Sequence, residues 1–139
     1  MTNPNGAAAV LDGLRLETGA ISGQVIATMP KQEADGFVYG VFPAYQVQAG
    51  DRLTARIGFS TGSDNACSAG KVSFIIAYLE GSQIQELQEW REGCDGSLLP
   101  VDIDLSGLEG RTLQFILAIR AGSELVSEIP VWNSVLIMR

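Results

Sequence analysis

The most constraining feature of the chain is the stretch of residues 101–119, VDIDLSGLEGRTLQFILAI. Its first part alternates apolar and acidic side chains, which is the period expected for a β-strand with one buried face. A turn follows at residues 106–110, and residues 113–119 are apolar on nearly both faces. This pattern predicts two strands joined by a short turn, which we expect to form the core hairpin, with the second strand central in its sheet.

Similar short segments recur at intervals of about 8–12 residues, with turn-forming residues between them. Residues 84–91 alternate poorly and would also suit a helix, but their short length and flanking turns favour a strand. The predicted strands are residues 14–17 (after the Asp12-Gly13 turn), 23–29, 37–42, 44–48, 52–59, 72–80, 84–91, 101–105, 113–119 and 131–138. The sequence therefore predicts an all-β fold, an antiparallel β-sandwich with jelly-roll topology.

The length of 139 residues suits one domain over residues 1–139, with residues 1–6 as a flexible start. A chain of this size buries roughly two-thirds of the surface that its unfolded form exposes. No segment approaches the roughly 20 apolar residues that span a bilayer, and the start lacks a signal-peptide pattern, so we expect no membrane insertion.

Charge and composition reduce the number of function classes that the chain can belong to. The chain has 16 acidic and nine basic residues, a formal net charge of −7, and no histidine. Because the basic residues are scattered singly, we do not expect nucleic-acid binding. Histidine is the usual general base and a common metal ligand, so we expect no enzymatic activity and, if any metal is bound, a hard cation such as calcium.

Cys67 and Cys94 lie at the outer ends of the hairpin predicted for residues 72–80 and 84–91. If these strands pair, the two ends are neighbours and a disulfide is geometrically plausible. In the entropic model it would stabilise the fold by about 3–4 kcal/mol. The alternative is two free thiols in a cytosolic protein.

Three stretches carry a family resemblance: VFPAYQVQAGDRL, the stretch of residues 101–119, and a closing strand around Val131-Trp132-Asn133. With these, residues 41–139 resemble the galactose-binding-like jelly-roll domains, including carbohydrate-binding modules of secreted bacterial proteins. The resemblance implies a non-catalytic recognition module for carbohydrate or a cell-surface polymer, located outside the cell or on its surface, with the cytoplasm as the alternative. The competing hypothesis is a structural or assembly domain that mediates protein contacts or self-association into a homo-oligomer.

Sugar-binding sites combine an aromatic platform with carboxylates and amides that bond hydroxyl groups. Trp90 is the best platform because polar residues surround it, although it would also fit packing at the sandwich edge, whereas Trp132 is expected in the core. If the cysteines are bonded, the loop at residues 60–71 would bring together a set of candidates for binding a cation or a polar ligand: Asp64, Asn65, Glu92 and Asp95. The alternative is an ordinary solvated loop.

Asp102 and Asp104 are two residues apart on one predicted strand, so both carboxylates would project from the same face about 6–7 Å apart. They are a candidate for calcium binding, and the alternative is a solvated strand face.

Overall fold

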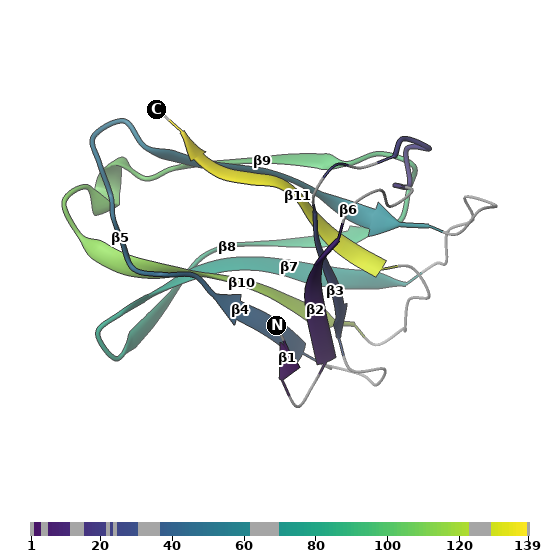
Figure 1. Cartoon of the computed structure of the whole chain (residues 1–139), viewed down its shortest axis with the longest axis horizontal. Helices are drawn as coiled ribbons and strands as arrows, with labels where there is room; N and C mark the ends of the chain where they lie inside the picture. Colours follow the sequence, from purple (N-terminus) through teal and green to yellow (C-terminus); the bar gives the residue numbers. More distant parts are fainter. Residues whose placement is uncertain are drawn as a thin grey trace.

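The computed structural model describes residues 2–3, 6–11, 16–21, 23, 25–30, 37–61, 70–122 and 129–138. They form two antiparallel sheets that pack face to face (Figure 1). The first sheet contains, in spatial order, β1 (Thr2–Asn3), β2 (Gly6–Leu11), β3 (Val25–Pro30), β11 (Ile129–Met138), β6 (Arg52–Ser60) and β9 (Leu99–Asp104). The second contains β4 (Phe37–Val41), β10 (Thr112–Ala121), β7 (Lys71–Glu80) and β8 (Gln83–Gly93), and β5 (Tyr45–Gln46) also pairs with β10. A 3-10 helix, η1 (Ser106–Leu108), joins β9 to β10, and no helix in the described ranges is long and apolar enough to cross a membrane.

The strand order is that of a jelly roll. The strands pair as an antiparallel ribbon with β7 and β8 at its closed end: β7 with β8, β6 with β9, β4 with β10, and β3 with β11. The ribbon wraps so that its pairs alternate between two four-stranded groups, β3-β11-β6-β9 and β4-β10-β7-β8. This arrangement confirms the predicted all-β sandwich and its jelly-roll topology.

The core lies between the sheets and is dominated by aromatic and β-branched side chains. Phe74 from the second sheet meets Phe59 and Trp132 from the first edge to face, with ring centroids 5.9 and 5.4 Å apart. Such T-shaped contacts add to the gain from burying the rings. Trp132 is 1% exposed, so its predicted place in the core is confirmed.

The β7–β8 hairpin also matches the prediction. Glu80 pairs with Gln83 across a tight turn in which Gly81 has φ of 61°, a conformation that favours glycine. The segment at residues 84–91 is therefore a strand and not a helix. At the open end of the hairpin Lys71 pairs with Gly93, which places Cys94 beside the start of β7.

Two predictions are wrong. Residues 101–119 do not form a hairpin, because β9 lies in the first sheet and β10 in the second, and η1 crosses between them. The first strand comes earlier than the predicted residues 14–17, because the chain already pairs in β2. Of the predicted stretch, Leu16 makes one isolated bridge with Ser60 and Glu17 begins a turn, while residues 14 and 15 lie outside the described residues.

Candidate binding site

The outer face of the second sheet is apolar because its two central strands are apolar on both sides. In β7, Phe74 and Ile76 point into the core, whereas Ile75 and Ala77 point outward. The same alternation in β10 buries Leu117 and turns its neighbours outward. A strand surrounded by other strands usually hides an apolar outer face under a further layer, which the described residues of this sheet do not supply.

This face is hollowed into a groove of about 560 Å³, called here the outer groove. Two cross-strand pairs, Ala77 with Ile116 and Ile75 with Ala118, form its floor and are less than a tenth exposed. The walls come from the outer strands and contain Tyr39 and Val41 on β4 and Ile84 on β8.

These wall residues are unusually exposed for apolar side chains. Tyr39 is 45%, Val41 43% and Ile84 68% exposed, and they are half of the large hydrophobic residues that are exposed in the described chain. Single exposed apolar residues are common, but a contiguous group around a hollow is typical of an interaction site.

Charged groups lie at the rim of the outer groove. Glu86 pairs in register with Ala77 of the floor, and Arg120 lines the opposite end. Arg120 donates a hydrogen bond of 3.0 Å to Glu89. The pKa of Glu89 is lowered, chiefly by a hydrogen bond from Ser73 and to a smaller extent by the contact with Arg120.

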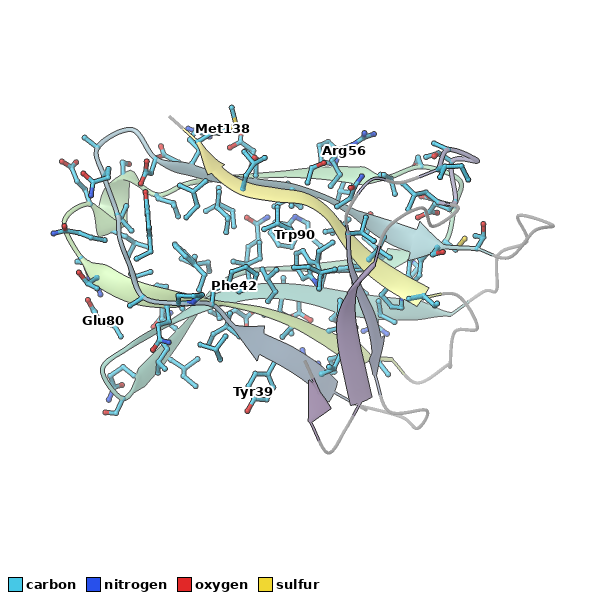
Figure 2. The ribbon with its side chains drawn as sticks, in the orientation of Figure 1. Tyr39, Phe42, Arg56, Glu80, Trp90 and Met138 are labelled. Carbon is cyan, nitrogen blue, oxygen red and sulfur yellow. The ribbon has the colours of Figure 1, made fainter. Side chains whose placement is uncertain are left out.

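Among the described residues the exposed aromatic side chain is that of Tyr39, whereas the predicted platform, Trp90, faces the interior (Figure 2). Trp90 lies opposite Phe74 in the β7–β8 ladder and packs, half-buried, against the core. Tyr39 was missed because the aromatic run at residues 37–42 does not show which of its faces is turned outward. Tyr39 pairs with Ala118 on β10, and this pairing turns the Tyr39 side chain to the outer face of the sheet.

A second polar centre lies at one end of the sandwich, around Glu17. This side chain is 1% exposed, and its two carboxylate oxygens accept three backbone hydrogen bonds. The donors are Phe59 N–H at 3.0 Å to Oε1, and Asp95 N–H at 2.6 Å and Gly96 N–H at 2.9 Å to Oε2. Glu17 therefore joins the end of β6 to the loop that connects β8 to β9.

Burial raises the pKa of Glu17, and the Asp95 carboxylate adds to the rise, while the three N–H donors oppose it. In the strand predicted for residues 14–17, Glu17 would lie on the face opposite to Leu16. Its donors lie 42 to 79 residues away in the sequence, so no local signal indicates its burial.

Two of the four predicted polar residues, Asp95 and Glu92, lie in or near this end. Asp95 is exposed and accepts hydrogen bonds of 3.0 Å from the N–H and the hydroxyl of Ser97, while Glu92 is half-buried on β8. Cys94 is disulfide-bonded, and its expected partner, Cys67, lies outside the described residues. Asp64 and Asn65 also lie outside them.

Asp102 and Asp104 project from the same face of β9, and both face Arg52 on the neighbouring strand. Arg52 Nε donates a hydrogen bond of 2.7 Å to Asp102, and its Nη1 lies 3.7 Å from Asp104 Oδ2. A hydrogen bond from Ser106 lowers the pKa of Asp104. The guanidinium group thus stands where the sequence suggested calcium, and the described residues contain no group of three or more acidic or cysteine side chains suited to a metal ion.

Comparison with known proteins found no matching family model and no curated protein with similar sequence. The resemblance to galactose-binding-like domains therefore stays a prediction from the sequence.

Proposed function

We propose that this protein is a non-catalytic binding domain whose recognition face is the outer groove, and that it docks an apolar surface of a partner protein. The observation that carries the proposal is the contiguous apolar lining, with Tyr39, Val41 and Ile84 exposed around a buried aliphatic floor. Covering such a surface with another apolar surface is favourable by about 25 cal/mol for each Å² that leaves water.

The distribution of polar groups favours a protein over a sugar. A sugar ring presents hydroxyl groups that need donors and acceptors within the site. The floor of the outer groove is aliphatic, and its charged side chains, Glu86 and Arg120, lie at the rim. A hydrophobic centre with a polar rim is the usual anatomy of a protein interface.

The charged residues at the rim of the outer groove indicate which side chains the partner surface carries. Arg120 is engaged with Glu89, whereas the structure gives the Glu86 side chain no ion pair among the described residues. The chain as a whole carries a net charge of −7. The partner surface is therefore aliphatic with a lysine or arginine placed to meet Glu86, an arrangement that fixes orientation and speeds association.

Carbohydrate binding is the second candidate, and Tyr39 is the observation that favours it. Tyr39 is 45% exposed at the edge of the outer groove, and a tyrosine ring stacks on the apolar face of a pyranose. The jelly-roll fold and the sequence resemblance agree with this candidate. The ligand would then be a sugar or a cell-surface polymer bound across Tyr39 and Arg120.

The setting that we propose is extracellular. Support comes from the disulfide-bonded state of Cys94, since stable disulfides form in oxidising compartments. Its partner in this proposal is Cys67, which stands four residues before β7 in the sequence.

Selection from a displayed peptide library, run beside a glycan array, tests both candidates. We expect enriched peptides that combine aliphatic and basic residues and that bind the wild type at least about tenfold more tightly than Ile84→Lys. Ile84 is 68% exposed, so this substitution leaves the core intact. Leu136→Lys is the matched control, because Leu136 is also exposed but lies on the first sheet.

The outcomes separate the candidates. Peptides that bind Ile84→Lys as tightly as the wild type would overturn the outer groove as the docking site. A glycan signal that Tyr39→Ala abolishes, with no enriched peptide, would replace protein docking by carbohydrate recognition. Silence in both assays would contradict both candidates.

A further inference from the structure

Each sheet has an edge strand that is protected by its sequence. Edge strands expose unpaired backbone groups, and proteins protect them with charges, prolines or covering segments. β9, at one edge of the first sheet, carries Pro100, Asp102 and Asp104. β8, at the edge of the second, carries four charged residues, which are Glu86, Glu89, Arg91 and Glu92.

The last part of β11 lacks such protection. β3 pairs with residues 131–133 of β11 and stops there, whereas β6 continues along the other side to Met138. The change coincides with a bulge at Ser134, where φ is 55° and the register with β6 shifts. In the described part of the chain no strand pairs with the free side of residues 134–138, and Figure 1 shows β2 and β3 crossing only the other end of β11.

The sequence of this free edge is SVLIM, without charge or proline. The bulge directs Val135 and Ile137 toward the core and leaves Leu136 46% and Met138 49% exposed. Figure 2 shows Met138 on the outer side of the first sheet. An apolar, unprotected edge of this kind is a template for a further strand.

An apolar crevice of about 250 Å³ lies beside this edge, between the two sheets. Val135 and Ile137 line it from the first sheet, and Phe42 and Phe115 from the second. Phe42 lies between the sheets (Figure 2) and is held by its N–H, which donates a hydrogen bond of 2.9 Å to the carbonyl oxygen of Phe115. The sandwich is thus incompletely closed along the same side on which the backbone of β11 is unpaired.

We propose that residues 134–138 pair antiparallel with the same residues of a second copy of the chain, which joins the two first sheets edge to edge across a two-fold axis. The free edge specifies the geometry, because its backbone groups are satisfied by an extended strand and not by a helix or a sugar. With the axis at Leu136, Leu136 faces its own counterpart and Val135 faces Ile137 of the other copy.

This register suits both sides of the joined sheet. On the outer side it covers Leu136 with a leucine, and on the inner side it places two Val–Ile pairs at the mouths of the two crevices. No charged side chain lies within residues 134–138, so none is brought opposite a like charge at the axis. Two-fold pairing of one patch with itself is the commonest form of assembly.

The contact is small, and each chain carries a charge of −7, so we expect a reversible dimer that salt strengthens by screening the repulsion. This inference rests on the free edge and the crevice, and it does not depend on the outer groove.

Sedimentation velocity of the intact protein, from about 1 µM to about 1 mM, tests it. We expect the wild type to shift from monomer to dimer over this range and Leu136→Lys to stay monomeric, because a lysine pair at the axis repels. Ile84→Lys, the matched control, should dimerise as the wild type does. Far-ultraviolet circular dichroism verifies that each variant is folded.

A second variant tests the register. Leu136→Cys should form an intermolecular disulfide on mild oxidation, detected on a non-reducing gel, while Ile84→Cys should not. A wild type that stays monomeric at every concentration and salt level would overturn the proposal. So would a dimer that is lost in Ile84→Lys and retained in Leu136→Lys, since self-association would then use the outer groove.

Discussion

Gly58 lies directly beneath the carboxylate of Glu17, and a Cβ atom at Gly58 would come within 2.6 Å of Glu17 Oε1. The same Cβ would also collide with Leu98. Because Gly58 leaves this space open, the buried carboxylate reaches the N–H groups of Phe59, Asp95 and Gly96. One glycine on β6 thus allows the β8–β9 loop to be fastened to the end of the sandwich.

Gly58→Ala should therefore lower the free energy of unfolding by about 1–3 kcal/mol, the usual cost of forcing an extra methyl group into a packed site. Chemical denaturation measures this change. Gly107→Ala is the control, because a Cβ there meets nothing within 4 Å. Equal midpoints for the two variants would show that the space above Gly58 is not restricted.

Glu17→Gln should destabilise the fold by about 1–3 kcal/mol. The amide has one acceptor oxygen where the carboxylate has two, so its NH₂ group must face at least one of the three N–H donors. The exposed Glu109 on the turn before Arg111 supplies the matched control, Glu109→Gln, which we expect to be neutral. Denaturation curves that coincide for the two variants would contradict the account of Glu17.

The pKa of Glu17 gives a pH dependence with a definite sign. Because burial raises this pKa above the ordinary value of 4.5, the folded chain holds the proton more tightly than the unfolded chain. The associated stability is present below the ordinary value and is lost as the pH rises through the folded pKa. Wild type should therefore lose stability relative to Glu17→Gln over this interval, and a carbon-13 titration should give a pKa above 4.5.

The comparison with Glu17→Gln is needed because other acidic residues change the stability with pH in the opposite direction. The hydrogen bond from Arg111 lowers the pKa of Glu80, and Ser73 and Arg120 lower that of Glu89. Their contributions are lost as the pH falls below the ordinary value. A Glu17 pKa at or below the ordinary value would show that the three N–H donors outweigh burial.

For the cysteines we predict no free thiol in the denatured, unreduced protein by Ellman titration, as expected for a Cys67–Cys94 bridge. Cys94→Ser should then cost about 3–4 kcal/mol of stability, because the unfolded chain regains the freedom that the bridge removes. Two titratable thiols per chain would contradict the bridge.

Much of the fold could be predicted because period-two alternation is a local property. The alternation in residues 52–59 and the apolar run at 72–80 gave β6 and β7 within a residue or two. Partner choice is not local. β9 and β10 are separated by a turn that would suit a hairpin, yet η1 carries the chain from one sheet to the other, and only the partners β6 and β7 decide this.

The candidate sites were harder to predict for the same reason. Polar neighbours around Trp90 suggested an exposed ring, but β8 pairs so that this ring faces Phe74 and the core. Tyr39 and Ile84 are 45 residues apart in sequence and come to opposite walls of one groove through four strands. The bulge at Ser134 changes which residues of β11 face inward, and alternation alone cannot locate it.

The central claim is that the outer groove is the recognition face, and backbone amide chemical-shift mapping tests it most directly. A peptide selected on the wild type is titrated into isotopically labelled protein. We predict the largest shifts at Ile75, Ala77, Ile116 and Ala118 on the groove floor. Shifts concentrated in residues 93–98 or 134–138, with the groove floor unchanged, would contradict the claim.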